Sequence, residues 1–179
     1  GLSITKSLVD IMVGTIHVRS EIKQQTTFTI SLEFKTISKN DLDTKKEIPI
    51  ELLRNKTILI VDDLEDNRNI MKEILVSSKM GLNILEATNG KLAIESVQRQ
   101  HPDIILMDLD MPEMNGFEAT QHLRKKYPDS KIKIIITTAS LLTTSVDELI
   151  EMGFNGILHK PIKPELLFET LCELIETEN

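Results

Sequence analysis

Asp103-Ile-Ile-Leu-Met-Asp-Leu-Asp-Met-Pro-Glu-Met-Asn-Gly116 is the stretch of this chain that decides its fold. Its apolar run, Ile104 to Met107, is short, lies between Pro102 and Pro112, and ends on the carboxylate of Asp108. A run of this length between turn residues predicts a buried parallel strand rather than a helix. Ligands of open α/β sheets bind at the carboxyl ends of the strands. We therefore expect Asp108 to lie at the functional edge of a sheet.

The chain around this stretch, from residue 57 onwards, alternates short apolar runs with amphipathic segments. The patterns predict strands at 57–61, 82–86, 104–108, 131–137 and 154–158, and helices at 66–79, 91–99, 117–126, 146–152 and 165–175. Five strand–helix units of this kind require parallel strands with right-handed crossovers. The first helix is predicted to turn Ile70, Ile74 and Leu75 towards the core. The expected fold class is α/β.

Composition narrows the class of protein and its partners. With 40% hydrophobic and 27% charged residues, the chain has the balance of a soluble globular protein. The net charge of -7 argues against nucleic acid as a partner, because phosphate binding needs clustered Lys and Arg. Cys172 is the single cysteine, which favours a reducing compartment, and we expect its thiol to be buried and inert. No run reaches the ~18 apolar residues of a membrane span, and no signal peptide is visible. We expect a cytoplasmic location without membrane contact, and leave open an anchor elsewhere in a longer parent.

Reactive side chains lie at the ends of four predicted strands, and a parallel sheet brings them to one edge: Asp62, Asp63, Asp108, Thr137, Thr138 and Lys160. Three carboxylates placed together repel one another, and a hard divalent cation such as Mg²⁺ relieves the repulsion. Lys160 adds a compact positive charge, and Thr138 adds a hydroxyl that can donate to a phosphate oxygen. The sheet edge therefore predicts a site for a phosphoryl ligand.

Within this site the roles separate. A carboxylate can attack phosphorus and become an aspartyl phosphate. Asp108 is the predicted nucleophile, because it ends the central strand between the acidic pair and Lys160, while Asp62 and Asp63 are predicted to hold the metal. No general base is needed, since a carboxylate is ionised near pH 7. Taken singly, the same residues could be helix-capping acids, a strand-end hydroxyl and a solvated lysine.

Four separated motifs resemble the receiver domain of two-component response regulators: Val61-Asp62-Asp63, Met107-Asp108 with Met111-Pro112 and Asn115-Gly116, Thr138-Ala139, and Lys160-Pro161. The resemblance covers about residues 56–177. It implies a flavodoxin-like (βα)5 doubly wound sheet in the order 2-1-3-4-5, with helices on both faces. It also implies that Asp108 accepts a phosphoryl group from the phosphohistidine of a histidine kinase or a histidine phosphotransfer domain.

The resemblance also assigns the neighbours of Asp108. Mg²⁺ would be held by Asp62, Asp63, Asp108 and the backbone carbonyl of Asp110. Lys160 and Thr138 would contact the phosphoryl group, and the Lys160-Pro161 peptide would be cis. Two positions depart from the family pattern. Ile157 stands where members usually have an aromatic residue, three positions before the lysine, and Asp110 adds a carboxylate that could shorten the lifetime of the phosphoaspartate.

The first 35 residues form a separate segment, with a helix expected at 1–13 and strands at 15–19 and 27–34. The order Gly1-Leu2-Ser3-Ile4-Thr5-Lys6, Gly14 and Thr27-Phe28-Thr29-Ile30 resembles the C-terminal end of the histidine-kinase ATP-binding domain. This resemblance implies a remnant at 1–35 without an ATP site, a linker at 36–55, a receiver domain at 56–179, and a hybrid histidine kinase as parent. The exposed apolar faces of the remnant are expected to pair as a homodimer or to stay mobile.

Two other functions compete with the phosphoacceptor. The same fold could serve as a constitutive protein-interaction module. Asp108-Leu109-Asp110 also resembles the nucleophile motif of haloacid-dehalogenase-type phosphatases, but there the metal-binding acids should follow that motif, and here they precede it. Whether the chain is an enzyme in its own right is left open, because we expect it to catalyse only its own phosphotransfer and dephosphorylation.

Overall fold

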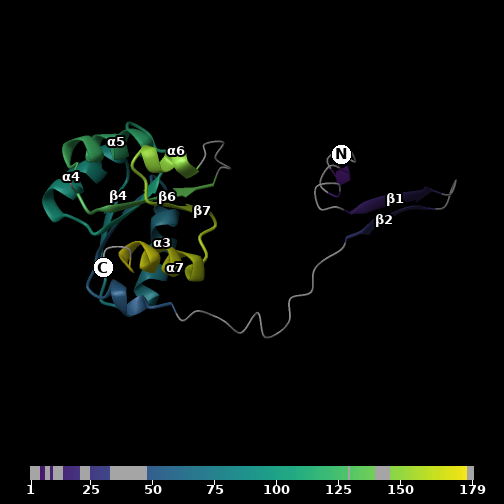
Figure 1. The fold of residues 1–179 in the computed structure, drawn as a ribbon, viewed down its shortest axis with the longest axis horizontal. Helices are drawn as coiled ribbons and strands as arrows, with labels where there is room; N and C mark the ends of the chain where they lie inside the picture. Colours follow the sequence, from purple (N-terminus) through teal and green to yellow (C-terminus); the bar gives the residue numbers. More distant parts are fainter. Residues whose placement is uncertain are drawn as a thin grey trace. The chain divides into compact units, whose positions relative to one another are not determined.

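The structure is a computed structural model that describes residues 5, 6, 9, 14–20, 25–32, 48–128, 130–139 and 146–176. The chain divides into two compact units, Gly1–Lys46 and Glu47–Asn179, which Figure 1 draws as ribbons. Most of the helix predicted at 1–13, and the predicted linker before residue 48, lie outside the described residues. Within the described part of the chain, no helix is long and apolar enough to cross a membrane.

The described part of the first unit is dominated by a hairpin. Strand β1 (Thr15–Ser20) pairs with β2 (Thr26–Ser31) in antiparallel register, with Thr15 opposite Ser31. The strands were predicted at 15–19 and 27–34, the second because apolar residues such as Phe28 and Ile30 alternate with polar ones, and β2 ends earlier than predicted, at Ser31. Three of their large apolar side chains are exposed, Val18, Phe28 and Ile30, while Ile16 is half-buried.

The second unit contains a five-stranded parallel sheet in the order β4-β3-β5-β6-β7, which confirms the predicted order 2-1-3-4-5. Its strands are β3 (Thr57–Val61), β4 (Asn83–Ala87), β5 (Ile104–Asp108), β6 (Lys133–Thr138) and β7 (Gly156–His159). All five residues of the central strand β5 are buried. The register places Asp108 opposite Thr137, and Thr138 opposite His159.

Helices cover both faces of this sheet (Figure 1). They are α3 (Glu65–Ser77), α4 (Gly90–Gln100), α5 (Gly116–Lys126), α6 (Val146–Glu151) and α7 (Pro164–Glu176). Strand residues alternate between the faces. Leu59 and Val61 join one core with α4, α5 and α6, whereas Ile58 and Ile60 join another with α3 and α7. The flavodoxin-like fold is therefore the one predicted.

Two details differ from the sequence-based expectations or add to them. Ile70 was predicted to face the core, but it is 54% exposed, and its neighbour Met71 is buried instead. Inside the predicted linker, residues Ile50–Leu53 form a 3-10 helix, η1, that packs against α7. Leu53 is fully buried there, in the same core as Leu171.

The loop behind β5 depends on Asn115 and Gly116. Asn115 caps α5 by accepting a hydrogen bond from the backbone N–H of Glu118, whose carboxylate accepts one from the N–H of Asn115. Such a capping box fixes where the helix begins. A Cβ atom at Gly116 would overlap the backbone carbonyl of Asp108. A glycine is therefore required for α5 to begin this close to the end of β5.

Candidate functional site

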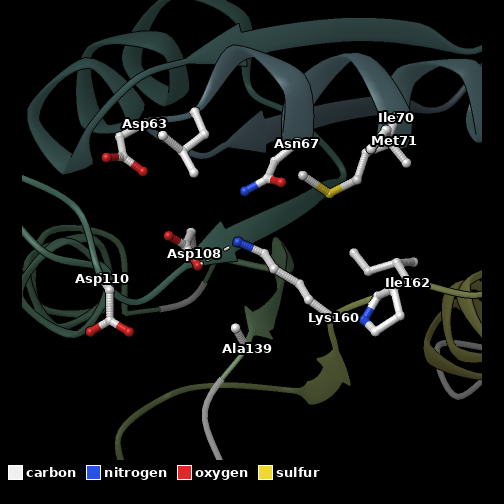
Figure 2. Close-up of a pocket in the computed structure, with 11 residues that line it drawn as sticks. Asp63, Asn67, Ile70, Met71, Asp108, Asp110, Ala139, Lys160 and Ile162 are labelled. Atoms are coloured by element: carbon white, nitrogen blue, oxygen red, sulfur yellow. Dashed lines mark hydrogen bonds and ion pairs between the residues drawn. The ribbon is translucent and has the colours of Figure 1, made fainter.

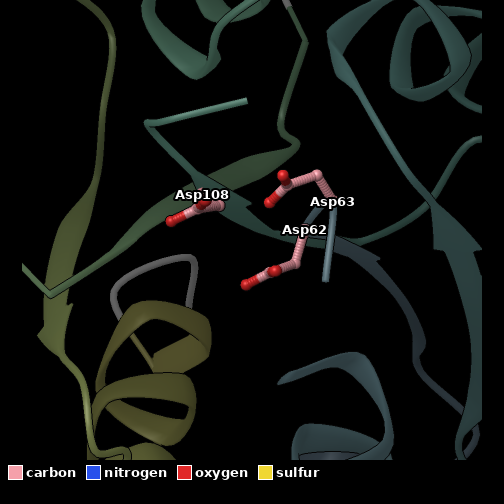
Figure 3. A group of neighbouring side chains, drawn as sticks. All are labelled: Asp62, Asp63 and Asp108. Carbon is pink, nitrogen blue, oxygen red and sulfur yellow. The ribbon is translucent and has the colours of Figure 1, made fainter. Parts of the chain in front are cut away.

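Three carboxylates meet at the C-terminal edge of the sheet. Asp62 directly follows β3 and is fully buried, and Asp108, the last residue of β5, is 6% exposed. One ligand oxygen from each of Asp62, Asp63 and Asp108 lies within 4.8 Å of the other two. Figure 3 shows the three side chains grouped at the ends of the neighbouring strands. The structure thus brings together the acids that the sequence singled out.

Lys160 joins two of these acids from the other side of the central strand. Its Nζ lies 2.6 Å from Asp62 Oδ2 and 2.8 Å from Asp108 Oδ1, and it donates a hydrogen bond to each. The side chain extends from the loop after β7 towards Asp108, as Figure 2 shows. The Lys160–Pro161 peptide is cis, as expected. The predicted counter-charge therefore touches both the central acid and one of the acidic pair.

Burial and charge act in opposite directions on this pair. Burial raises the pKa of the Asp108 carboxyl above its usual value, while the hydrogen bond and the charge of Lys160 limit the rise. Burial alone would lower the pKa of Lys160, but the hydrogen bonds that it donates to Asp108 and Asp62, with their negative charges, outweigh burial, so that the pKa is raised. Lys160 therefore remains a cation at neutral pH and compensates the charge of Asp108.

The carboxylate of Asp62 is surrounded by donors. Its Oδ1 accepts hydrogen bonds from the backbone N–H of Leu64 and from Asn67 Nδ2, both at 3.0 Å. Asn67 Nδ2 also lies 3.1 Å from Oδ2, the oxygen that Lys160 contacts. Asn67 was not predicted from the sequence, because an amide on an exposed first helical turn carries no signal of its own. Its position one helical turn after the acidic pair could have revealed it.

The two threonines at the end of β6 occupy different positions in the sheet: Thr137 lies opposite Asp108, and Thr138 lies opposite His159. Thr138 is the last residue of the strand and is 1% exposed. Thr137 lies opposite Asp108 in the register and is fully buried, and its hydroxyl has no hydrogen-bond partner among the described residues. Of this segment, Ala139 is the residue that lines the cavity beside Asp108.

A cavity of about 610 Å³ opens beside Asp108 and Lys160. Its charged walls also include Asp63 and Asp110, and Figure 2 shows both carboxylates near that of Asp108. The apolar part of the wall comes largely from α3 and from the loop after β7: Leu64, Ile70, Met71, Pro161 and Ile162. The exposed side chain of Ile70 therefore forms part of the cavity wall. The cavity leaves the Asp108 carboxylate accessible to a ligand.

The donor set fits Mg²⁺. Three carboxylates supply hard oxygen ligands, which this ion prefers over nitrogen or sulfur. Lys160 compensates one of their three negative charges, so the cluster retains about two, the charge that a divalent cation balances. Among the described residues, Asp62, Asp63 and Asp108 form the one cluster of three or more acidic, histidine or cysteine side chains close enough together to share a metal ion.

Ile157 occupies the position at which the family pattern has an aromatic residue. It lies in β7, opposite Ile136, and packs partly buried against the core beneath α4, α5 and α6. The aliphatic side chain fills this place by packing alone.

Comparison with known proteins gives consistent matches. The model of the response regulator receiver domain family matches residues 58–172. The sensor protein EvgS of Escherichia coli K12 is 35% identical over 176 residues, which are 97% of this chain and 14% of EvgS. The chemotaxis protein CheY of Thermotoga maritima is 38% identical over 117 residues, 65% of this chain and 94% of CheY. This chain therefore spans about one seventh of EvgS, whereas its match to CheY covers nearly all of CheY.

A solved structure of a receiver domain also resembles this chain. The receiver domain of the sensor histidine kinase PA1611 from Pseudomonas aeruginosa PAO1 superposes with a TM-score of 0.60 and 30% identity. The match covers 68% of this chain and 98% of that one. That structure holds a magnesium ion coordinated in its active-site cleft.

Proposed function

Because this chain belongs to the response regulator receiver domain family of two-component phosphorelay signalling, we propose that Asp108 is its phosphoacceptor. The observation that carries the proposal is the contact of the Asp108 carboxylate with Lys160, 2.8 Å away, at the wall of an open cavity. Two further acids lie beside it. The nucleophile, its counter-charge and access for a donor are thus present together.

In the proposed reaction a carboxylate oxygen of Asp108 attacks the phosphorus of a donor phosphohistidine. The new P–O bond forms as the P–N bond breaks, and the electron pair of that bond stays on the imidazole nitrogen of the donor. Lys160 compensates the negative charge of the Asp108 carboxylate before transfer and that of the phosphoryl oxygens during it. The hydroxyl of Thr138 donates a hydrogen bond to one of these oxygens. Asp108 needs no base, because it reacts as the carboxylate.

We place the Mg²⁺ site at Asp62, Asp63, Asp108 and the backbone carbonyl of Asp110. When bound, Mg²⁺ would neutralise charge on the equatorial oxygens of the transferred group. Asp62 contributes a carboxylate whose orientation is fixed by Leu64 and Asn67. The magnesium in the cleft of the PA1611 receiver domain supports the assignment.

We further propose the domain layout and the partners. Residues 1–35 would be the remnant of a histidine-kinase ATP-binding domain, 36–55 a linker whose residues Ile50–Leu53 pack against α7, and 56–179 the receiver, within a cytoplasmic part of a hybrid histidine kinase. The alignment with EvgS supports this layout, because it covers 97% of the chain and so extends before the receiver match at residue 58. A histidine kinase or histidine phosphotransfer domain would be the donor, and residues 1–35 would form a homodimer.

Acetyl phosphate with Mg²⁺ tests the function. The intact chain should gain the mass of one phosphoryl group, and Asp108→Asn should gain none. The matched variant Asp110→Asn keeps the nucleophile, so it should be phosphorylated, with a longer-lived product if the Asp110 carboxylate orients water for hydrolysis. A chain that takes up no phosphoryl group from acetyl phosphate or a phosphohistidine donor would instead be a constitutive interaction module.

A further inference from the structure

Arg68, in the first turn of α3, reaches back to the two acids that precede the helix. Its Nη1 donates to the backbone carbonyl of Asp62 at 2.8 Å and to that of Asp63 at 3.2 Å. The Arg68 side chain is only 12% exposed. One guanidinium nitrogen therefore holds the backbone of both acidic residues.

The same guanidinium forms an ion pair with the neighbouring strand, although its Nε has no hydrogen-bond partner among the described residues. Its Nε lies 3.4 Å from Oε2 of Glu86 in β4, and Lys72 pairs with the other oxygen, Oε1, at 2.5 Å. The hydrogen bond from Lys72 and the charges of Lys72 and Arg68 lower the pKa of Glu86, although burial opposes them. Glu86 is therefore an anion at neutral pH, and Arg68 links it to the loop that carries the acids.

This link matters because Asp62 and Asp63 are consecutive. Consecutive side chains of a strand point to opposite faces, so two adjacent acids can share one cation only where the chain leaves the strand conformation. β3 ends at Val61, just before them. The hydrogen bonds from Arg68 to the backbone carbonyls of Asp62 and Asp63 stabilise this non-strand conformation. Asn67 holds the carboxylate of Asp62 in place.

We propose that Arg68, anchored by Glu86, is a positioning residue that sets Asp62 and Asp63 in place for the cation. This inference rests on the proposed Mg²⁺ site and assigns a residue outside it. Arg68 touches neither the cation nor the reacting atoms. Partners that orient metal ligands typically change metal affinity by about 10- to 100-fold when they are altered.

The test is Arg68→Lys in the whole chain, with the dissociation constant of Mg²⁺ measured by isothermal titration calorimetry. Lysine keeps the positive charge, but its single nitrogen cannot hold both carbonyls and Glu86 at once. We expect Mg²⁺ to bind about 10-fold more weakly. Lys72→Met is the matched control, since Lys72 pairs with the same Glu86 carboxylate, through its other oxygen, from one turn further along α3. Its affinity should stay within about twofold of the wild type.

Glu86→Gln gives a second reading that does not depend on how Arg68→Lys folds. It retains Arg68 and removes the charge of its anchor, so Mg²⁺ affinity should fall by about threefold or more. The inference is overturned if Arg68→Lys binds Mg²⁺ as tightly as the wild type, or if Lys72→Met loses as much Mg²⁺ affinity as Arg68→Lys. In either case, Mg²⁺ binding and phosphorylation of the wild type would leave the proposed function intact. A wild-type chain that binds no Mg²⁺ and accepts no phosphoryl group refutes both.

Discussion

Replacing Lys160 by methionine keeps an unbranched apolar chain of nearly the same length and removes the ammonium that lies 2.6 Å from Asp62 and 2.8 Å from Asp108. Both carboxylates lose their compensating cation. The pKa of Asp108 should then rise further, because burial and the charge of Asp62 both raise it and Lys160 no longer opposes them. The variant should be less stable than the wild type at neutral pH.

The size of the loss follows from the burial of the pair. Leaving a buried charge without its partner costs about 3–5 kcal/mol. Asp62 is fully buried, but Asp108 lines an open cavity where water can solvate it, so we expect the lower end, about 3 kcal/mol. For a unit of about 130 residues, this corresponds to a fall in Tm of roughly 10 °C.

Thermal unfolding followed by far-UV circular dichroism, with and without Mg²⁺, measures the effect. Mg²⁺ should raise the Tm of Lys160→Met more than that of the wild type, because the negative charge of the carboxylates in the variant is no longer compensated by Lys160. The control is Lys163→Met, an exposed lysine three positions further on. Equal Tm values for Lys160→Met and the wild type in Mg²⁺-free buffer would refute the reasoning that Lys160 stabilises the site.

Three further predictions concern the second unit. Leu53→Ala should lower the free energy of unfolding in urea by about 3 kcal/mol, because Leu53 is fully buried, whereas exposed Leu64→Ala should cost under about 0.5 kcal/mol; equal midpoints would contradict the packing of η1. Thr137→Val should stabilise the unmodified chain by about 1 kcal/mol by removing a buried hydroxyl that has no hydrogen-bond partner among the described residues, and a destabilised variant would contradict this. Burial raises the pKa of the Cys172 thiol from 9.0 to about 11, so the unfolded thiol ionises at lower pH than the folded one. Stability should therefore decline above about pH 9, by roughly 1.4 kcal/mol at pH 10, and Cys172→Ala should remove this slope; identical pH profiles would count against it.

The order of the sheet and the meeting of the acids could be predicted from the sequence, because both follow from strand ends. The apolar run that ends on Asp108 indicates a buried parallel strand, and parallel strands share one functional edge. The positions of Asp62 and Lys160 at that edge follow from the same rule. Their contact at 2.6 Å does not, since it depends on the conformation of a long side chain.

Helix faces were harder to predict than strand ends. Ile70, Met71, Ile74 and Leu75 offer two overlapping apolar faces with nearly the same periodicity, and tertiary packing buries Met71 rather than Ile70. Arg68 and Glu86 are charged residues far apart in sequence, and no pattern indicates that one anchors the other. The docking of Leu53 on α7 likewise depends on a contact between distant segments.

The central claim, that Asp108 accepts the phosphoryl group, is tested most directly by locating the modification. After phosphorylation with acetyl phosphate and Mg²⁺, borohydride reduces an aspartyl phosphate to homoserine, which peptide mass spectrometry can assign to a residue. We predict homoserine at position 108 and aspartate unchanged at 62, 63 and 110. Homoserine at any of those three positions, or at none, would contradict the assignment of Asp108.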